Sequence, residues 1–331
     1  MKYTMTMEFA VTAIVVFVLT VLAERVLIPI LRSHKAGQRI LEIGPRWHKA
    51  KEGTPIMGGI GFILTTLLAA AAFFIVRAVR GTSAQYIPLA LTLAFAVCNG
   101  AIGFVDDYCK LIKKQNEGLK WYQKLILQFT IAIAFVVVMS YTGNMDTDVA
   151  LPFTSKVWHL GWGFYPLAVI ALVGVVNGGN ITDGIDGLAS SVTWVIGGLF
   201  AVWAFSVGND SLGLVGAVLL GSMLGFLVYN FHPARIFMGD TGSLFLGALA
   251  IGTCFMMGRE LVGLIVCAVF IFEMFTSFLQ VAWFRLSHGK RLFKMAPFHH
   301  HLEKCSWNEY QIVGFFFAIE IAVCVLAWFA K

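Results

Sequence analysis

Long apolar runs alternate with short polar connections along this chain, the pattern of a protein that crosses a membrane many times. A bilayer-spanning helix needs roughly 20 mostly apolar residues. Seven runs contain no Asp, Glu, Lys or Arg: 53–76, 81–105, 125–145, 157–182, 187–209, 211–234 and 241–258. Three more apolar stretches carry some charge: 8–30, 260–284 and 309–330. The pattern predicts an all-α integral membrane protein with about ten transmembrane helices in a single polytopic domain, residues 1–331.

Composition supports a membrane protein over a soluble one. Apolar residues make up 59% of the chain and charged residues 13%, against about 25% charged in a typical soluble domain. The six cysteines form no CxxC pair and lie mostly in apolar runs, so they are expected to be small core residues. The first run lacks a small-residue cleavage site before Glu24 and Arg25, which favours a retained helix over a signal peptide.

The distribution of basic residues predicts the orientation. Of the 24 Lys and Arg residues, 17 fall in the odd-numbered connections between the ten expected helices. Basic residues concentrate on the cytoplasmic side of a membrane protein. Both termini are therefore expected on the outer side, and the acidic clusters described next are expected at the cytoplasmic ends of the helices.

The net charge of +6 is explained by this bias and by attraction to anionic headgroups. A second interpretation is that Lys49, Lys110 and Lys124, which lie near glycine-rich or acidic segments, hold a polyanionic substrate. Nucleic acid is a poor candidate because the sequence has no soluble basic domain to bind it.

Five of the eight aspartates lie in three clusters at the ends of apolar runs: Asp106 with Asp107, Asp183 with Asp186, and Asp240. Ionisable groups beside the hydrocarbon are costly and usually line a wet cavity, form pairs or bind metal. Adjacent carboxylates repel each other, and a shared cation such as Mg²⁺ with oxygen ligands relieves that repulsion. The alternative for the first pair, a solvated helix end, places acids where a helix prefers cations.

Three glycine-rich segments accompany these acids. Residues 49–59 lead into the second helix, and small residues there could serve either ligand approach or helix packing. Residues 177–188 hold four glycines, two amides and two acids, a poor composition for a helix, although a re-entrant turn is an alternative. Residues 237–244 open the eighth helix and suit a phosphate and its metal. Asp240 could be only the N-cap of that helix, a role that is compatible with binding a metal.

The final cytoplasmic connection contains three consecutive histidines, His299, His300 and His301. Consecutive positions cannot share one helical face, so a zinc site built from all three is geometrically awkward. Hydrogen bonding to a ligand or to a diphosphate fits better. A surface amphipathic segment is the alternative, and it would explain Phe293 and Phe298 but not the histidines.

Five motifs in order resemble the polyprenyl-phosphate N-acetylhexosamine-1-phosphate transferase superfamily, and the triple histidine resembles its phospho-N-acetylmuramoyl-pentapeptide transferase branch. The motifs are residues 54–59, 106–110, 180–188, 238–243 and 296–301. Ile56 and Phe298 depart from the residues common in the family, and neither change removes a charged group.

This resemblance implies a homodimer in the bacterial inner membrane with its active-site cleft facing the cytoplasm. The implied enzyme uses Mg²⁺ to move phospho-MurNAc-pentapeptide from UDP-MurNAc-pentapeptide to undecaprenyl phosphate, giving lipid I and UMP. The implied catalytic residues are Asp106, Asp107, Asp240, Lys110 and Lys124, with Asp240 as metal ligand and Asp106 and Asp107 as further candidate ligands. The implied substrate contacts are Lys49, Thr54, Asn180, Asp183, Asp186, Asn230, Phe237, Ser243, Gln280, His299, His300 and His301.

Two alternatives stay open at this point. The first is a GlcNAc-1-phosphate transferase of the same superfamily. The second is a secondary transporter or lipid flippase, although such proteins tend to place acids near the bilayer midplane in repeated broken helices. Glu273 and Glu320 lie within apolar runs, and the sequence assigns them no role beyond a buried structural hydrogen bond.

Overall fold

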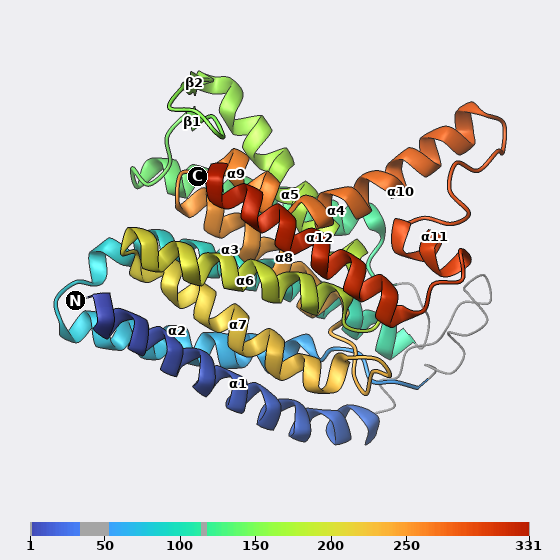
Figure 1. Cartoon of the computed structure of the whole chain (residues 1–331), viewed down its shortest axis with the longest axis horizontal. Coiled ribbons are helices and arrows are strands. Elements are labelled where there is room, and N and C mark those ends of the chain that lie inside the picture. The colour runs from blue at the N-terminus through green and yellow to red at the C-terminus, as the bar shows by residue number, and fades with distance from the viewer. Residues whose placement is uncertain (1, 34–52, 114–117, 331) are drawn as a thin grey trace.

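The chain folds as an elongated bundle of helices with one short hairpin of strands (Figure 1). This computed structural model describes residues 2–33, 53–113 and 118–330. The helices of the first half are α1 (Lys2–Ser33), α2 (Gly59–Val79), the 3₁₀ helix η2 (Ser83–Tyr86), α3 (Ile87–Lys113), α4 (Trp121–Tyr141), the 3₁₀ helix η3 (Gly161–Gly163) and α5 (Phe164–Thr182). The antiparallel strands β1 (Asp148–Ala150) and β2 (Val157–His159) lie between α4 and η3. The second half comprises α6 (Leu188–Val207), α7 (Asp210–Asn230), α8 (Gly239–Met256), α9 (Glu260–Val266), α10 (Ala268–Leu286), α11 (Phe298–Lys304) and α12 (Glu309–Ala330).

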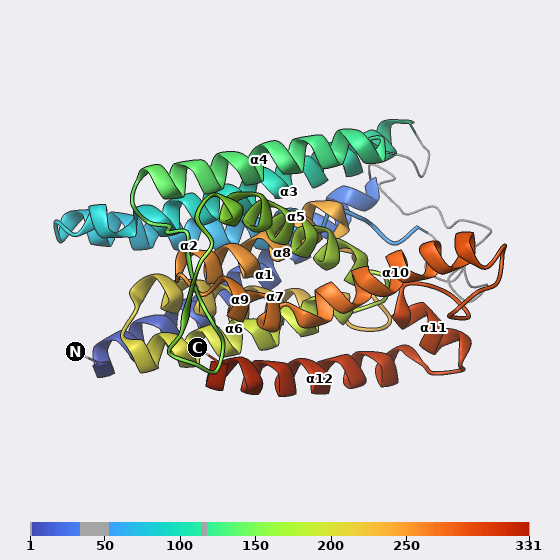
Figure 2. The same ribbon diagram turned by 90° about the horizontal axis from the view of Figure 1, so that it is seen from above.

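Ten helices in the described part of the chain are long and apolar enough to cross a membrane. They are α1 to α8, α10 and α12, with the third span starting within η2 and the fifth within η3. The prediction of an all-α, multi-pass membrane protein is confirmed. Figure 2 shows the N- and C-terminal labels toward one end of the bundle and α11 at the other.

The predicted ninth span, residues 260–284, is not one helix. The chain forms the seven-residue α9, breaks at Cys267 and restarts as α10 at Ala268. An apolar composition indicates that a segment contacts lipid or the protein core. It does not indicate whether the helix is continuous. The count of ten survives because α10 alone is long enough to span.

Two polar motifs contain more helical residues than their amino-acid composition predicted. Residues 106–110 lie in the last turns of the third helix as expected, and α3 continues three residues past them to Lys113. Lys110 forms an i,i+4 ion pair with Asp106, and such pairs and a terminal lysine support a helix end. The glycine-rich segment from Asn177 to Thr182 is likewise helical, as the end of α5.

Helix α8 is the centre of the bundle and carries the polar motif at its first turn. Every residue from Thr241 to Phe255 is buried, and the helix packs against α2, α3, α5 and α9. The contact with α3 is close enough to require glycine: a Cβ atom added to Gly103 would lie 2.1 Å from the carbonyl oxygen of Asp240. This packing brings the acidic end of α3 against the start of α8.

Candidate functional site

Three carboxylates from α3 and α8 meet at one end of the bundle. Asp106 and Asp107 lie in the last two turns of α3, and Asp240 lies in the first turn of α8. Each offers a carboxylate oxygen, and these oxygens all lie within 4.8 Å of one another. The expectation that distant acidic clusters converge on one site is therefore confirmed for these three residues.

Two lysines balance most of this negative charge. The Lys110 ammonium lies 2.6 Å from Asp106 Oδ2 and 3.2 Å from Asp240 Oδ2. The Lys124 ammonium, from α4, lies 2.9 Å from the same Asp240 oxygen. With all five groups ionised, three carboxylates and two ammonium groups leave one net negative charge. A region so close to neutrality tolerates burial at a helix end far better than three unpaired acids would.

Asn180 at the end of α5 orients the Asp240 carboxylate. Its Nδ2 donates to Asp240 Oδ1 at 2.8 Å, and its Oδ1 accepts from Lys124 at 3.1 Å. The same amide nitrogen lies 2.8 Å from the hydroxyl oxygen of Ser243, one turn along α8. Asp240 thus has one oxygen held by an amide and the other facing two cations.

Asp107 has a different role, because it caps α8. Its Oδ2 accepts hydrogen bonds from the Thr241 backbone N–H at 2.9 Å and from the Thr241 hydroxyl at 2.7 Å, and its Oδ1 accepts from the Asp240 N–H at 3.2 Å. The N-cap position itself is Met238, which supplies no side-chain cap. The alternative of Asp240 as the N-cap is therefore wrong, because a carboxylate from α3 satisfies the free N–H groups of α8.

Asp106 ties the site to the segment that precedes α4. Its Oδ1 accepts from the backbone N–H of Leu119 at 2.7 Å, while its Oδ2 faces Lys110. We call Asp106, Asp107 and Asp240 the carboxylate centre. The segment that carries Lys124 is thereby anchored to this centre.

Asp183 follows α5 and lies near the same centre. Burial raises the pKa of its carboxyl well above the usual range, and the negative charges of Asp240 and Asp107 raise it further. The next residue, Gly184, lies against His299, since a Cβ atom at Gly184 would be 2.2 Å from His299 Nε2. The loop after α5 and helix α11 therefore meet at this point.

His299 is held by Glu273, a residue to which the sequence assigned no specific role. The imidazole Nδ1 of His299 lies 3.1 Å from Glu273 Oε2, and the His299 backbone N–H donates to the same carboxylate at 3.2 Å. Both side chains are fully buried, and His299 Nε2 has no hydrogen-bond partner among the described residues. Glu273 thus directs His299 Nε2 toward the Asp183–Gly184 turn. The sequence signal for this role was an acid in the middle of an apolar run, and sequence reasoning did not connect it with the histidine.

The other two histidines point elsewhere. His300 Nδ1 pairs with Glu303 Oε2 at 2.5 Å, and His301 Nδ1 accepts from the Lys294 N–H at 3.1 Å beside the rings of Phe293 and Phe298. Neither group of side chains that could hold a metal among the described residues contains a histidine from this run. The three histidine side chains therefore have different partners.

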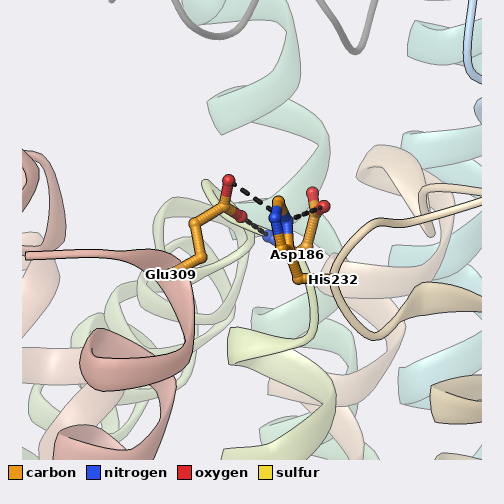
Figure 3. A group of neighbouring side chains, drawn as sticks. All are labelled: Asp186, His232 and Glu309. Atoms are coloured by element: carbon orange, nitrogen blue, oxygen red, sulfur yellow. Dashed lines mark hydrogen bonds and ion pairs between the residues drawn. The ribbon is translucent and has the colours of Figure 1, made fainter.

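A second cluster joins three segments of chain (Figure 3). His232 Nδ1 lies 2.9 Å from Asp186 Oδ2 and 3.4 Å from Glu309 Oε1. Glu309 Oε2 accepts from the Asp186 N–H at 3.0 Å, and the Ala234 N–H donates to Asp186 Oδ2 at 2.9 Å. We call Asp186, His232 and Glu309 the loop clamp, because they fasten the α5–α6 loop, the α7–α8 loop and the start of α12 together. Sequence reasoning missed His232 and Glu309, which belong to none of the five motifs.

Comparisons with known proteins identify the family. The family model of glycosyl transferase family 4 matches residues 89–258. A phospho-N-acetylmuramoyl-pentapeptide-transferase of Clostridium novyi (strain NT) is 38% identical over 317 residues, covering 96% of this chain and 95% of the relative. Proteins of the same name are 39% identical in Bacillus subtilis (strain 168), over 95% of both chains, and 39% identical in Staphylococcus aureus (strain bovine RF122 / ET3-1), over 93% and 95%.

The chain belongs to the phospho-N-acetylmuramoyl-pentapeptide transferases of glycosyl transferase family 4. The resemblance drawn from the five motifs is confirmed. The transporter and flippase alternative is not supported, since these relatives are named as transferases over nearly their whole length.

Two of the residues expected to contact the substrate, Asn230 and Gln280, form hydrogen bonds within the fold. Asn230 is buried, with its amide group bonded to the Ser190 hydroxyl and to the Ile236 carbonyl. Gln280 Oε1 accepts from the Phe293 N–H at 2.8 Å, which ties α10 to the segment before α11. These two residues hold the α7–α8 loop and the segment before α11 in place, and among the described residues their amide groups form no hydrogen bond to the three carboxylates.

The remaining expected contacts lie on the entry to α2 and on the α7–α8 loop. Phe237 is half-buried, and its backbone N–H donates to the Pro55 carbonyl at 2.8 Å while its carbonyl accepts from the Gly58 N–H at 2.9 Å. Thr54, also half-buried, is therefore close to the start of α8. Lys49 lies outside the described residues.

The carboxylate centre fits a divalent cation by the chemistry of its donors. Asp106, Asp107 and Asp240 supply hard oxygen ligands of the kind that Mg²⁺ prefers. The Lys110 ammonium already lies among the three, which shows that the space favours positive charge. Because the oxygens of Asp107 are taken up by the start of α8, Asp240 and Asp106 are the better ligands.

Proposed function

We propose that this protein transfers phospho-MurNAc-pentapeptide from UDP-MurNAc-pentapeptide to undecaprenyl phosphate, releasing UMP and forming lipid I, a membrane step of peptidoglycan synthesis. The shared name of relatives 38% to 39% identical over about 95% of the chain supports the reaction. The observation that carries the proposal is the arrangement of Asp240 between Lys110, Lys124 and Asn180. Cations and an amide around one carboxylate suit a site that handles phosphates.

Charge balance gives the roles of the side chains. The site has one net negative charge when fully ionised, whereas both substrates carry phosphate charge. A bound Mg²⁺, held by Asp240 with Asp106, would supply the positive charge that stabilises the diphosphate and the UMP leaving group. Lys110 and Lys124 would then be released from Asp240 in part and could draw the acceptor phosphate toward the sugar phosphate.

Asp106 is proposed to position groups, and a role as a base or covalent nucleophile is not favoured. A phosphate monoester has a second pKa near 6, so undecaprenyl phosphate is mostly dianionic at neutral pH and gains little from a general base. Asp106 also already holds Leu119 and Lys110 in place. Incubation with UDP-MurNAc-pentapeptide alone is expected to leave no phosphoryl-aspartate, and trapping one would support the two-step route instead.

The remaining contacts would recognise the nucleotide and the sugar. His299 Nε2, buried and facing the Asp183–Gly184 turn, is placed to bond a diphosphate or sugar oxygen. Phe237 is proposed to offer its ring to the uracil, and Thr54, Asp183 and Ser243 to contact the sugar diphosphate. The whole chain would act as one catalytic domain, paired as a homodimer in the bacterial inner membrane, with this site on the cytoplasmic side, where nucleotide sugars are made.

Release of UMP by purified protein in detergent tests the proposal. UDP-MurNAc-pentapeptide with undecaprenyl phosphate and Mg²⁺ should give UMP and a lipid-linked product, and excess chelator should stop the reaction. UDP-GlcNAc in place of the muramoyl substrate should give none. Turnover of UDP-GlcNAc alone would assign the chain to the other branch, and chelator-insensitive release would remove the metal from the proposal.

A further inference from the structure

A buried pair of side chains fastens α10 to α11 beside the transferase site. Glu273 of α10 has no exposed side-chain surface, and the side chain of His299, the second residue of α11, is 1% exposed. The His299 Nδ1 lies 3.1 Å from Glu273 Oε2, and the His299 backbone N–H donates to Oε1 at 3.2 Å and to Oε2 at 3.4 Å. Two donors of one residue therefore meet one carboxylate inside the protein.

The Glu273 carboxylate fixes both the orientation of the His299 ring and the position of its proton. A carboxylate accepts hydrogen bonds, so Nδ1 carries the proton that points to Glu273, and Nε2 is left to meet another group. Among the described residues, Glu273 pairs with His299 and with no lysine or arginine. Because an unpaired buried carboxylate is costly, this environment favours a positive charge on the ring.

The His299 Nε2 is the atom that points to a ligand. It is buried and has no hydrogen-bond partner among the described residues, although leaving a buried polar atom unpaired is costly. A Cβ atom added to Gly184 would lie 2.2 Å from Nε2 and 2.6 Å from Cε1 of the same ring. Gly184 does not have a positive φ angle. The close approach of the ring, and not the backbone conformation, therefore requires a glycine in this turn.

The same turn borders the carboxylate centre. Gly184 follows Asp183, whose carboxyl is affected by the charges of Asp240 and Asp107. Asn180, which ends the same helix, donates to Asp240 Oδ1 at 2.8 Å. The carboxylate centre and the His299 ring thus lie on two sides of one short segment of chain.

We propose that Glu273 is a positioning residue for the transfer, which holds His299 as an imidazolium whose Nε2–H donates to an oxygen of the sugar diphosphate. A diphosphate oxygen accepts hydrogen bonds, so Nε2 must carry a proton while Nδ1 directs its own proton to Glu273. The carboxylate balances the charge of the ring, and the bond to the diphosphate is charge-assisted. This inference rests on the proposed function, because it needs a diphosphate substrate.

Binding of UDP-MurNAc-pentapeptide tests the role of Glu273 without turnover. Dissociation constants are measured by calorimetric titration of the full-length protein in detergent, with Mg²⁺ and without undecaprenyl phosphate. Glu273→Gln keeps the shape of the side chain and removes its charge. It should weaken binding about tenfold or more, because the ring loses its counter-charge and the hydrogen bond to the substrate its charge assistance.

Glu320→Gln is the matched control. Glu320 is also a fully buried glutamate within a spanning helix, and its Oε1 contacts Cys324 Sγ at 3.5 Å instead of a histidine. This variant should bind the substrate as the wild type does. An equal loss of affinity in both variants would show that removing any buried acid weakens binding, and it would overturn the specific role of Glu273.

A double-mutant cycle with His299→Gln separates positioning from a purely structural role. If Glu273 acts through the ring, Glu273→Gln should weaken binding by less than about twofold once His299 is replaced. A residue that only joins α10 to α11 would weaken binding by the same factor in both backgrounds, and that result overturns the inference. Unchanged affinity in Glu273→Gln, shown to be folded by its thermal midpoint, also overturns it.

Gly184→Ala decides the matter if Glu273→Gln does not fold. The added methyl group would push the ring away without altering any charge, so it should weaken binding about tenfold as well. Wild-type affinity in this variant would overturn the inference. Failure of the proposed function would look different, because the wild-type protein itself would then not bind UDP-MurNAc-pentapeptide, and both proposals would fall.

Discussion

At the scale of single residues, the three acids of the carboxylate centre bond different partners, although sequence reasoning treated them alike. Asp240 has both oxygens directed at polar groups of the site, whereas Asp107 uses its oxygens to cap α8. The motifs contain all three, and the structure brings their carboxylates together. Their separate roles could not be predicted, because those roles depend on which backbone N–H groups the fold brings to each carboxylate.

Asp240→Asn should reduce UMP release by at least about a thousandfold, because losing a metal-binding charge removes several kcal/mol of transition-state stabilisation. The thermal midpoint should change little, since the isosteric amide can still bond Asn180. UMP release measures the activity, and a thermal melt of the same preparation measures the thermal midpoint. Asp148→Asn, at the far end of the bundle, is the control and should keep full activity. Near-normal turnover in Asp240→Asn would remove Asp240 from the metal role.

Glu260 should make stability depend on pH. Its carboxyl has a pKa of about 7 in the fold against 4.5 when exposed, so the folded state retains a proton between these values that the unfolded state has lost. Stability should therefore fall as pH rises from about 4.5 to 7 and stay lower above pH 7, by roughly 3 kcal/mol.

Glu260→Gln should remove this dependence. The thermal midpoints of wild type and variant should coincide near pH 4.5, and the variant should melt higher at pH 8. Equal midpoints at both pH values would show that the carboxylate is solvated in the folded protein.

At the scale of elements, the site depends on how closely α3 approaches α8. Hydropathy predicted where both helices lie, because the cost of exposing polar backbone to lipid enforces long apolar runs. It did not predict the break at Cys267 or the extension of α3 to Lys113, which depend on local pairs and packing. Nor could periodicity show that a glycine sets the distance between the two helices.

Gly103→Ala should lower UMP release strongly without altering any charged or polar side chain. The new methyl group would lie 2.1 Å from the Asp240 carbonyl oxygen, so the start of α8 must move away from Asp106 and Asp107. The thermal midpoint should fall as well. Gly174→Ala on α5 is the control, because its nearest neighbour there is a methionine methyl group at 3.6 Å. Equal activity of the two variants would contradict the close packing of α3 on α8.

The loop clamp should stabilise the protein and order the substrate loops. His232→Ala removes the imidazole that contacts both the Asp186 and the Glu309 carboxylates, a loss of about 1–3 kcal/mol for hydrogen bonds to charged groups. We expect a lower thermal midpoint and a raised KM for the nucleotide substrate. Tyr310→Phe removes only the hydroxyl that donates to the His232 carbonyl, so its effects should be smaller. A larger loss in Tyr310→Phe would show that the clamp does not depend on the His232 ring.

At the scale of the whole molecule, the two ends of the bundle differ. One end gathers the carboxylate centre, the loop clamp and α11, and the other gathers the strands and α9, which contacts β1. The number of spans and the meeting of the acidic motifs could be predicted from the sequence. The central position of α8 could not, because packing partners are decided by complementary surfaces that a single hydropathy profile does not contain.

Cysteine labelling should show which end faces the cytoplasm. In a background without the native cysteines, Thr154→Cys between the strands should react with an impermeant maleimide added to intact spheroplasts. Lys290→Cys, in the segment between α10 and α11, should react only after the membrane is permeabilised. Both positions are exposed, so access alone decides the result. The reverse pattern would contradict the orientation that the basic residues predict.

The pairing of Asp106 and Asp240 with Lys110 and Lys124 also bears on how the molecule is assembled in the cell. Because these internal counterions hold the loops together, we expect newly inserted chains to reach their final shape without a metal ion. Under the proposed magnesium dependence, a cell starved of magnesium would then accumulate folded but inactive copies.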